Sequence, residues 1–309
     1  MSSLIILRRV RVENANAIAG LTWGFPAVTH FLGFTHALSR RLEAENLSLT
    51  GCGIICHDTQ LHAHKSNWDF NFALTRNPLT KEAKTAAFNE EGRMHMTVSL
   101  VLECEGMIAD GEHGINQLCA KLQQICPTLR LAAGNITHIA RISVVTRPET
   151  EEGLRKLLWP LMPGFALLDR APLLEQHFSE LKQQNPEAQM LDAWLDFSAL
   201  KIAAQPAEEN ENVEWHTQPK PAAGYLVPLM TGYQGISPLY QPGEVENARD
   251  PEQPFRFVEA TYGVGEWRGV HRISDLDELL WRYHYQDNQY LCQSKQPVEE
   301  LVYDELDFD

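Results

Sequence analysis

The stretch LTWGFPAVTHFLGFTHALSRRLEAE, residues 21–45, decides how the first half of the chain is expected to fold. A Trp-Gly-Phe-Pro turn precedes apolar residues at helical spacing, namely Phe31, Phe34, Leu38 and Leu42. Pro26 and Thr29 are typical of a helix start. We therefore predict an amphipathic helix after the turn. Its polar side carries His36, Arg40 and Arg41.

Strands are expected on both sides of this helix. SLIILRRVRV (3–12) alternates weakly and predicts a strand with Arg9 and Arg11 on one face. LTGCGIICHDTQLHA (49–63) and RMHMTVSLVLEC (93–104) predict two more strands. GINQLCAKLQQIC (114–126) predicts an amphipathic helix, and LRLAAGNITHIARISVV (129–145) predicts a fourth strand. The order β-α-β-β-α-β is the ferredoxin-like, split βαβ arrangement.

The second half has a different pattern. We expect helices over 151–164, 171–184 and 186–203, turn-rich β structure over 224–260, and a helix over SDLDELLWRYHY (274–285) with Ser274 as its N-cap. Residues 205–222 are acidic and Pro-rich, which predicts an exposed loop. The prediction is an α+β protein with a ferredoxin-like domain over residues 1–147 and a mixed α/β region over 148–309.

Charge is unevenly distributed along the chain. The formal net charge of −15 by itself argues against a nucleic-acid partner. Residues 1–100, however, hold 10 Lys and Arg against 8 Asp and Glu, whereas the rest of the chain holds 16 against 33. A locally basic first half can bind phosphates, and the acidic half could face a protein. Ordinary solubilising charge explains the acidic half equally well.

Location and redox state follow from two further patterns. No run approaches the roughly 20 apolar residues of a membrane span, and the N-terminal apolar segment, followed by arginines, predicts a strand rather than a signal peptide. The six cysteines form no CxxC pair and most lie in apolar segments. We expect reduced core cysteines in a cytoplasmic protein with no membrane partner.

A long segment between the second and third strands, residues 65–92, is expected to be functional because a few residues would suffice to join them. Aromatic residues alternate with polar ones at Trp68, Phe70 and Phe72, which predicts a hairpin with one apolar face. Its basic residues would meet phosphates and its apolar edge would contact bases. A hairpin packed on its own domain is the alternative.

Four residues cluster at the end of the second strand: His57, Asp58, His62 and His64. A His-x-His pair on one strand would place both rings on one face, as a metal pair requires. A histidine could instead act as a general base on an RNA 2′-hydroxyl. No third ligand stands at a recognisable spacing, so local hydrogen bonding is the simpler interpretation. We expect neither a metal nor a cofactor.

Several stretches resemble one family. They are NANAIAGLTWGFPAVTHFLGFTHALSRRL, GIICHDTQ, FALTRNPL, EEGRMHMTVSLVLE, LMPGFALLDR and SPLYQPGEVENARDPEQPFRFVEATYGVGEW, spread over residues 4–284. All are similar to the second subunit of the Csy complex, the type I-F CRISPR RNA-guided surveillance complex. The resemblance implies a ferredoxin-like, RRM-related fold and a subunit that binds the 5′ handle of CRISPR RNA.

The resemblance also implies partners: the large Csy subunit as a heterodimer, the first backbone subunit, and target DNA nearby. A thumb-like hairpin would lie against the RNA, in the 65–92 insertion. The family subunit is not the processing nuclease, so no catalytic residue is expected. The residues expected to bind RNA are Arg9, Arg11, Asn14, Asn16, Trp23, Phe25, His36, Arg40, Arg41, Lys65, Arg76, Asn77 and Arg93.

Two rival functions stay open. The first is an endoribonuclease that processes CRISPR RNA through His57, His62 or His64. The second is an adaptor that contacts the large subunit and hardly touches RNA. Exposed apolar surface at Trp159, Trp194 and Trp267 would suit an obligate protein partner.

Overall fold

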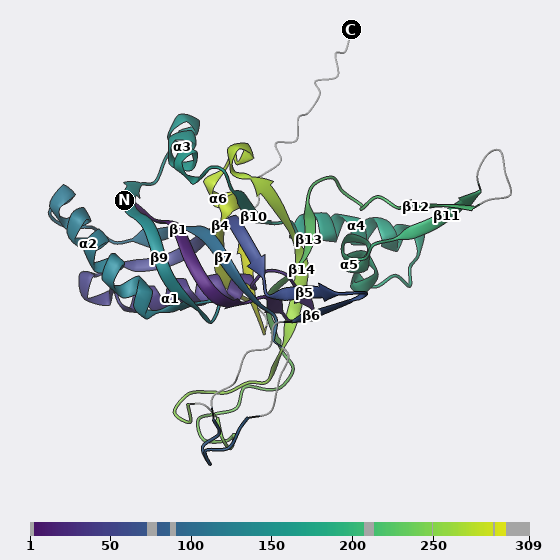
Figure 1. Ribbon diagram of the computed structural model, residues 1–309, viewed down its shortest axis with the longest axis horizontal. Coiled ribbons are helices and arrows are strands. Elements are labelled where there is room, and N and C mark those ends of the chain that lie inside the picture. Colours follow the sequence, from purple (N-terminus) through teal and green to yellow (C-terminus); the bar gives the residue numbers. More distant parts are fainter. Residues whose placement is uncertain are drawn as a thin grey trace, which may run out of the picture.

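The computed structural model describes residues 3–72, 79–86, 91–206, 213–248, 250–286 and 288–294. Its helices are α1 Val28–Arg40, α2 Gly111–Ile125, α3 Glu151–Leu158, α4 Ala171–Gln184, α5 Met190–Ser198 and α6 Leu276–Leu279. Its strands are β1 Ser3–Asn16, β2 Ile18–Ala19, β3 Thr22–Trp23, β4 Ser48–Leu61, β5 Ala63–Ser66, β6 Asp69–Phe72, β7 Arg93–Glu105, β8 Arg130–Leu131, β9 Gly134–Thr146, β10 Phe165–Asp169, β11 Ile202–Pro206, β12 Val213–Thr217, β13 Leu226–Gly235, β14 Val258–Gly269, β15 Leu280–Gln286 and β16 Gln289–Ser294. The result is a mixed α/β fold around one large antiparallel sheet (Figure 1).

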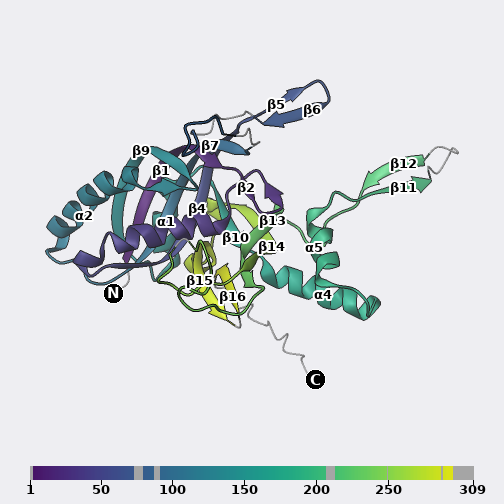
Figure 2. The ribbon, with the colours of Figure 1, turned by 90° about the horizontal axis from the view of Figure 1, so that it is seen from below.

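The four long strands of the first half lie in the order β9-β1-β7-β4, and every neighbouring pair is antiparallel. α1 connects β1 to β4, and α2 connects β7 to β9. Both helices cover the same face of the sheet, as the view from below shows (Figure 2). The predicted succession of four long strands and two helices is therefore present.

The sheet branches at β4 and continues into the second half of the chain. One edge of β4 pairs with β7, while the other pairs with β15 at Cys52–Gly53 and with β10 at Ile55–Cys56. β10, β14, β13, β16 and β15 are neighbours in turn, so these five strands and β4 form a closed ring. Strands from both sides of residue 148 thus share one sheet, and the predicted domain boundary there stays a prediction.

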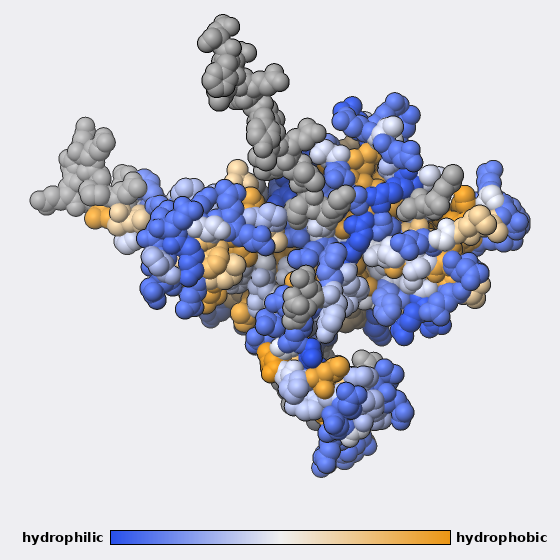
Figure 3. Space-filling model, turned by 180° about the vertical axis from the view of Figure 1, so that it is seen from behind, coloured by the Kyte–Doolittle hydropathy of each residue, from blue (hydrophilic) through white to orange (hydrophobic). Residues whose placement is uncertain are grey.

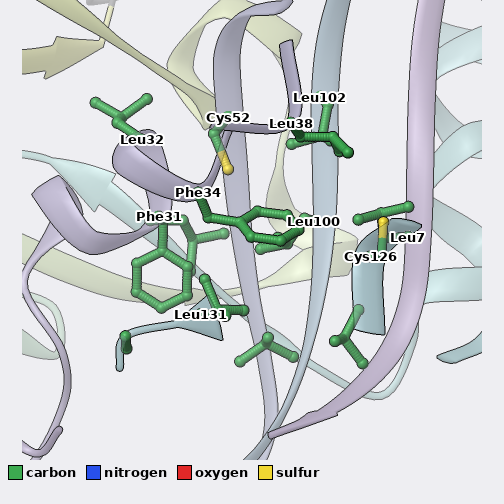
Figure 4. Packing of buried hydrophobic residues seen from close by; sticks show 14 of the residues in the cluster. Leu7, Phe31, Leu32, Phe34, Leu38, Cys52, Leu100, Leu102, Cys126 and Leu131 are labelled. Carbon is green, nitrogen blue, oxygen red and sulfur yellow. The ribbon is translucent and has the colours of Figure 1, made fainter. Parts of the chain in front are cut away.

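The main core lies between the helical face of the sheet and α1 and α2. Leu7, Leu100 and Leu102 point from the strands toward Phe31 and Leu38 of α1, and all five are buried (Figure 4). The spacing of Phe31, Phe34 and Leu38 gives α1 its buried stripe, as predicted. His36, Arg40 and Arg41 are exposed on the outer side of α1, which is also as predicted.

A second core lies on the opposite face and is shorter. Leu4 and Ile6 of β1 pack there against Leu154, Leu157 and Leu158 of α3. From Arg8 onward, no helix among the described residues packs on this side of β1. We call this part, from Arg8 to Asn16 with its neighbours on β7 and β9, the open face.

The helix predicted over 274–285 is wrong in its second half. The helix is only Leu276–Leu279, its N-cap is Asp275 rather than Ser274, and Leu280–Gln286 is strand β15. Trp281 is fully buried, and its indole N–H donates to the Leu167 carbonyl at 2.8 Å. Pairing with β16 and β4 outweighs the helical pattern because Trp and Tyr suit a half-buried strand.

Three other elements differ from expectation. The helix predicted to reach residue 203 ends at Ser198, and Ile202–Pro206 and Val213–Thr217 form a hairpin where an irregular loop was predicted. This hairpin, the arm, projects from the body in Figure 1. The predicted fourth strand is split into β8 and β9, because Ala132 and Ala133 have positive φ angles of 49° and 61°.

Cysteine burial follows the prediction only in part. Cys52, Cys104, Cys126 and Cys292 are buried, whereas Cys56 and Cys119 are partly exposed. Burial raises the pKa of Cys52 to about 12, so this thiol stays protonated and unreactive near neutral pH. Across the described ranges, no helix is both long and apolar enough to cross a membrane.

Candidate nucleic-acid interface

A β-bulge in β1 shapes the open face. Leu7 pairs with Leu100 and Val10 pairs with Val98, so Arg8 and Arg9 together stand opposite Ser99. Arg9 has a positive φ of 49°, and its backbone N–H donates to Ser99 Oγ at 2.9 Å. Its guanidinium donates to the Met162 carbonyl at 3.4 Å, on the side of the sheet away from α1. The bulge re-aims the arginines onto the open face.

His57 of the neighbouring strand β4 holds Ser99, and Ser99 in turn holds the bulge. His57 Nε2 lies 2.6 Å from Ser99 Oγ, and Nδ1 lies 2.7 Å from the Pro163 carbonyl oxygen. The carbonyl can only accept, so Nδ1–H donates to Pro163 and Nε2 accepts the Ser99 hydroxyl proton. Burial lowers the pKa of His57, and the charges of Arg9 and Arg8 lower it further, against the opposing hydrogen bond to Pro163. The ring is therefore neutral near pH 7.

The open face also carries Arg11 and Asn14. Arg11 lies opposite Thr97 of β7 and His138 of β9, and its guanidinium lies 3.3 Å from Glu13 Oε1. Asn14 has a positive φ of 59° in a second bulge, where its N–H donates to His95 Nδ1 at 3.1 Å. The structure thus brings together Arg9, Arg11 and Asn14 among the residues predicted to bind RNA.

Arg8 and Arg141 lie on the same face but were not among the predicted residues. Arg8 pairs with Arg141 across β1 and β9, and directly opposite residues point to the same side of a sheet. Only the register between β1 and β9 reveals this pair. The sequence alone does not give that register.

Trp23 and Phe25 line an aromatic cavity of about 750 Å³ at the mouth of the strand ring. Its other aromatic walls are Phe165, Trp194, Tyr225 and Trp267. Phe25 stacks on Phe31 at 5.6 Å between ring centroids and meets Trp267 edge-on at 4.9 Å. No Lys, Arg, His, Asp or Glu is among its lining residues. The predicted Trp-Gly-Phe-Pro turn therefore builds one wall of an apolar, ring-lined cavity.

Other predicted residues lie away from both places or are already engaged. His36, Arg40 and Arg41 occupy the outer side of α1, on the helical face of the sheet. Asn16 hydrogen-bonds the backbone of Ile18 through both its amide atoms, at 2.8 and 3.1 Å. Arg93 donates to Glu91 at 2.8 Å through Nε. Arg76 and Asn77 lie outside the described residues.

The predicted hairpin in the 65–92 insertion is present as β5 and β6. Phe70 and Phe72 belong to β6, but Trp68 lies in the turn and is 93% exposed. The Lys65 ammonium lies 5.9 Å from the Phe70 ring centroid. Residues 73–78 and 87–90 of the insertion lie outside the described residues. The hairpin tip therefore presents an exposed indole and a cation to solvent.

The His-x-His arrangement differs from expectation. His62 lies in the bend after β4 and His64 in β5, so the pair is not on one strand. The His62 ring stands edge-on to His95 at 4.2 Å, and burial lowers the pKa of His62, with His95 adding to this. Within the described ranges, no three His, Cys, Asp or Glu residues are placed to hold a metal ion.

Exposed apolar side chains gather on α5 and the arm. Leu191 and Leu195 of α5 are exposed, and so are Ile202 and Trp215 of the arm. Hydrophobic colour marks the arm and the α4–α5 segment in the rear view (Figure 3). Of the three tryptophans considered as surface for a protein partner, only Trp159 is exposed, at 73%. Trp194 is partly buried and donates to the Gly263 carbonyl at 2.9 Å, and Trp267 packs on Phe25.

Known proteins similar to this chain agree with the resemblance in its sequence. The family model described as CRISPR-associated protein (Cas_Csy2) matches residues 5–292. CRISPR-associated protein Csy2 of Pseudomonas aeruginosa (strain UCBPP-PA14) is 38% identical over 315 residues, which cover 96% of this chain and 95% of that protein. The family match includes the open face and the aromatic cavity. The chain therefore belongs to the Csy2 family of CRISPR-associated proteins.

Proposed function

We propose that this protein is a non-catalytic subunit of a type I-F CRISPR surveillance complex that binds the 5′ handle of CRISPR RNA. The observation that carries the proposal is the open face. Arg9, Arg11 and Asn14 share it, although the chain as a whole is strongly acidic. Arginines on a sheet face, with helices on the other side, suit a phosphate backbone lying across the strands.

The strand order β9-β1-β7-β4 supports a ferredoxin-like, RRM-related domain over residues 1–147. In RRM domains, aromatic residues on the sheet stack the bases. Here the open face has arginines and histidines instead, so it would hold the sugar-phosphate backbone of the RNA. Trp23 and Phe25 at the edge of the aromatic cavity would then stack an unpaired base, a role that suits Trp23 because this residue is 49% exposed.

Pairing with the large Csy subunit is the second part of the proposal. The exposed apolar side chains of α5 and the arm support it, because large aromatic and aliphatic side chains dominate the centres of protein interfaces. A two-stranded ribbon such as the arm is marginally stable alone in water. The arm therefore suits a protein partner, with the first backbone subunit and the target DNA close by in a cytoplasmic assembly.

The geometry of His57 supports a non-catalytic role. Both of its ring nitrogens are already engaged, with Ser99 and Pro163. A general base needs a free nitrogen within hydrogen-bond reach of the proton it removes. Endoribonuclease activity through His57, His62 or His64 is the competing function. Incubation of repeat RNA with the pure protein tests it: specific cleavage that disappears in His→Ala variants would establish the enzyme.

The main experiment is filter binding of handle RNA and of a scrambled RNA to the chain co-expressed with its large-subunit partner, at two salt concentrations. We expect tight, salt-sensitive binding that prefers the handle, with the RNA intact afterwards. Equal binding of both RNAs would reject handle recognition. In that case the adaptor function would replace the proposed one.

A further inference from the structure

Two arginines lie directly opposite each other on the open face. Arg8 of β1 and Arg141 of β9 are cross-strand partners, and β9 is the edge of the sheet at this point. Like charges directly opposite each other destabilise a sheet. Among the described residues, no Asp or Glu forms an ion pair with Arg8, Arg9 or Arg141. The repulsion is therefore not relieved within the described part of the chain.

Arg8 also has an unsatisfied donor. Its Nε atom is buried and has no hydrogen-bond partner in the described structure. An unpaired buried donor of a charged group costs about 1–3 kcal/mol or more. Arg9 joins the pair from the bulge, where the Ser99–His57 hydrogen bonds hold its backbone. Arg141, Arg8 and Arg9 thus occupy neighbouring positions of β9 and β1, where the phosphates of a strand lying across the sheet would offset their charge.

We propose that Arg8, Arg9 and Arg141 form a phosphate-binding site, the bulge site, that takes consecutive phosphates of a bound RNA strand. Guanidinium groups suit this ligand because their fork of N–H donors matches phosphate oxygens. Glu13 and Asp58 are the acidic residues that the register places on the same face, and Glu13 is already paired with Arg11. Ser99 and His57 are positioning residues that act through the Arg9 backbone. The inference rests on the proposed RNA-binding function.

The test compares the double variant Arg8→Gln, Arg141→Gln with the control Arg130→Gln, Arg155→Gln, which removes the same charge from exposed positions elsewhere. The protein is purified with its large-subunit partner, and handle and scrambled RNA are titrated over a range of salt. We expect weaker binding of both RNAs, an unchanged ratio between them, and a salt slope smaller by about 1.4 for two lost contacts to single-stranded RNA. Affinity and slope equal to those of the control would overturn the bulge site.

Thermal unfolding without RNA gives an independent readout. Removing the opposed charge in Arg141→Gln should leave the Tm unchanged or raise it, whereas a clear fall would show that Arg141 has a structural role and would overturn the inference.

Inorganic phosphate separates the possible sources of the anion. Stabilisation by phosphate that requires Arg8, without any change in RNA binding, would assign the site to a free anion and reject the RNA backbone.

A double-mutant cycle tests the positioning role. Ser99→Ala should weaken RNA binding and reduce the salt slope in the same direction as Arg9→Gln, Ser99→Thr should restore both, and the combined variant should show less than the sum. Additive effects would reject the link between Ser99 and Arg9. If the wild type binds handle and scrambled RNA equally, handle recognition fails, whereas the salt slopes of the variants still decide the bulge site.

Discussion

Arg282 of β15 donates two hydrogen bonds to the carboxylate of Glu103 in β7, at 2.7 and 2.9 Å, although 179 residues separate them in the chain. Arg147 donates to the same carboxylate at 2.5 Å, and Asp277 accepts from Arg282 at 2.8 Å. These four side chains tie the strands of the first half to the C-terminal strands. A bidentate arginine–carboxylate pair fixes geometry as well as charge.

Arg282→Ala should lower the free energy of unfolding by about 2 kcal/mol, because it leaves Glu103 and Asp277 with one arginine to share. Urea denaturation followed by circular dichroism measures the change. Arg155→Ala is the matched control, since Arg155 forms an exposed pair with Glu151 on α3. It should cost less than about 0.5 kcal/mol. Equal losses in both variants would contradict a special role for the Glu103 network.

Acid should weaken the same network. Burial by itself would raise the pKa of Glu103, but hydrogen bonds from Arg282 and its charge hold that pKa below the ordinary value, and the pKa of Asp277 is lowered in the same way by Arg147 and Arg282. A carboxyl with a lower pKa in the folded state stabilises the protein above its unfolded pKa, about 4, and loses this contribution as the pH falls.

We expect the Tm of the wild type to fall steeply below about pH 4.5. The Tm of Glu103→Gln should fall less over the same range, when each protein is compared with its own Tm at pH 7. Differential scanning calorimetry at a series of pH values measures it. The same pH dependence in Glu103→Gln and in the wild type would place the acid-sensitive groups elsewhere.

Trp23→Ala should weaken handle binding by about 1–3 kcal/mol, the range for loss of one base-stacking ring. The fold should persist, because Trp23 is half exposed and its ring contact is with Phe72 at 5.8 Å. Fluorescence anisotropy with labelled RNA gives the affinity. Trp159→Ala, at another exposed tryptophan, is the control. Unchanged RNA affinity with Trp23→Ala would indicate that the aromatic cavity takes a protein side chain instead.

Arg40→Glu with Arg41→Glu should weaken handle binding and reduce its salt dependence if α1 contacts the phosphate backbone. The structure makes this a sharp test, because these arginines lie on the helical face and Arg9 lies on the open face. The control Arg155→Glu with Lys156→Glu makes the same charge change on α3. An unchanged affinity and salt slope would make Arg40 and Arg41 solubilising residues.

Two pairs of residues predicted to bind RNA, Arg9 with Arg11 and Arg40 with Arg41, show which features local sequence patterns predict. Alternation predicts Arg9 and Arg11 on one face, and the structure agrees in spite of a bulge at Arg9 that alternation does not predict. The helical spacing predicts Arg40 and Arg41 on an exposed side, and both are exposed at the end of α1. Their separation from Arg9 depends on which face of the sheet the helix covers, and no local pattern encodes that.

The sequence by itself determined the elements with strong periodicity: β1, α1, β4, β7, α2 and β9, and with them the succession of the first half. Local spacing fixes such elements because each buries one apolar side. Only the tertiary structure decided that Leu280–Gln286 is a strand, that β4 branches into a ring, and that Arg8 faces Arg141. These features depend on pairing between segments far apart in the chain, where long-range contacts outweigh local propensity.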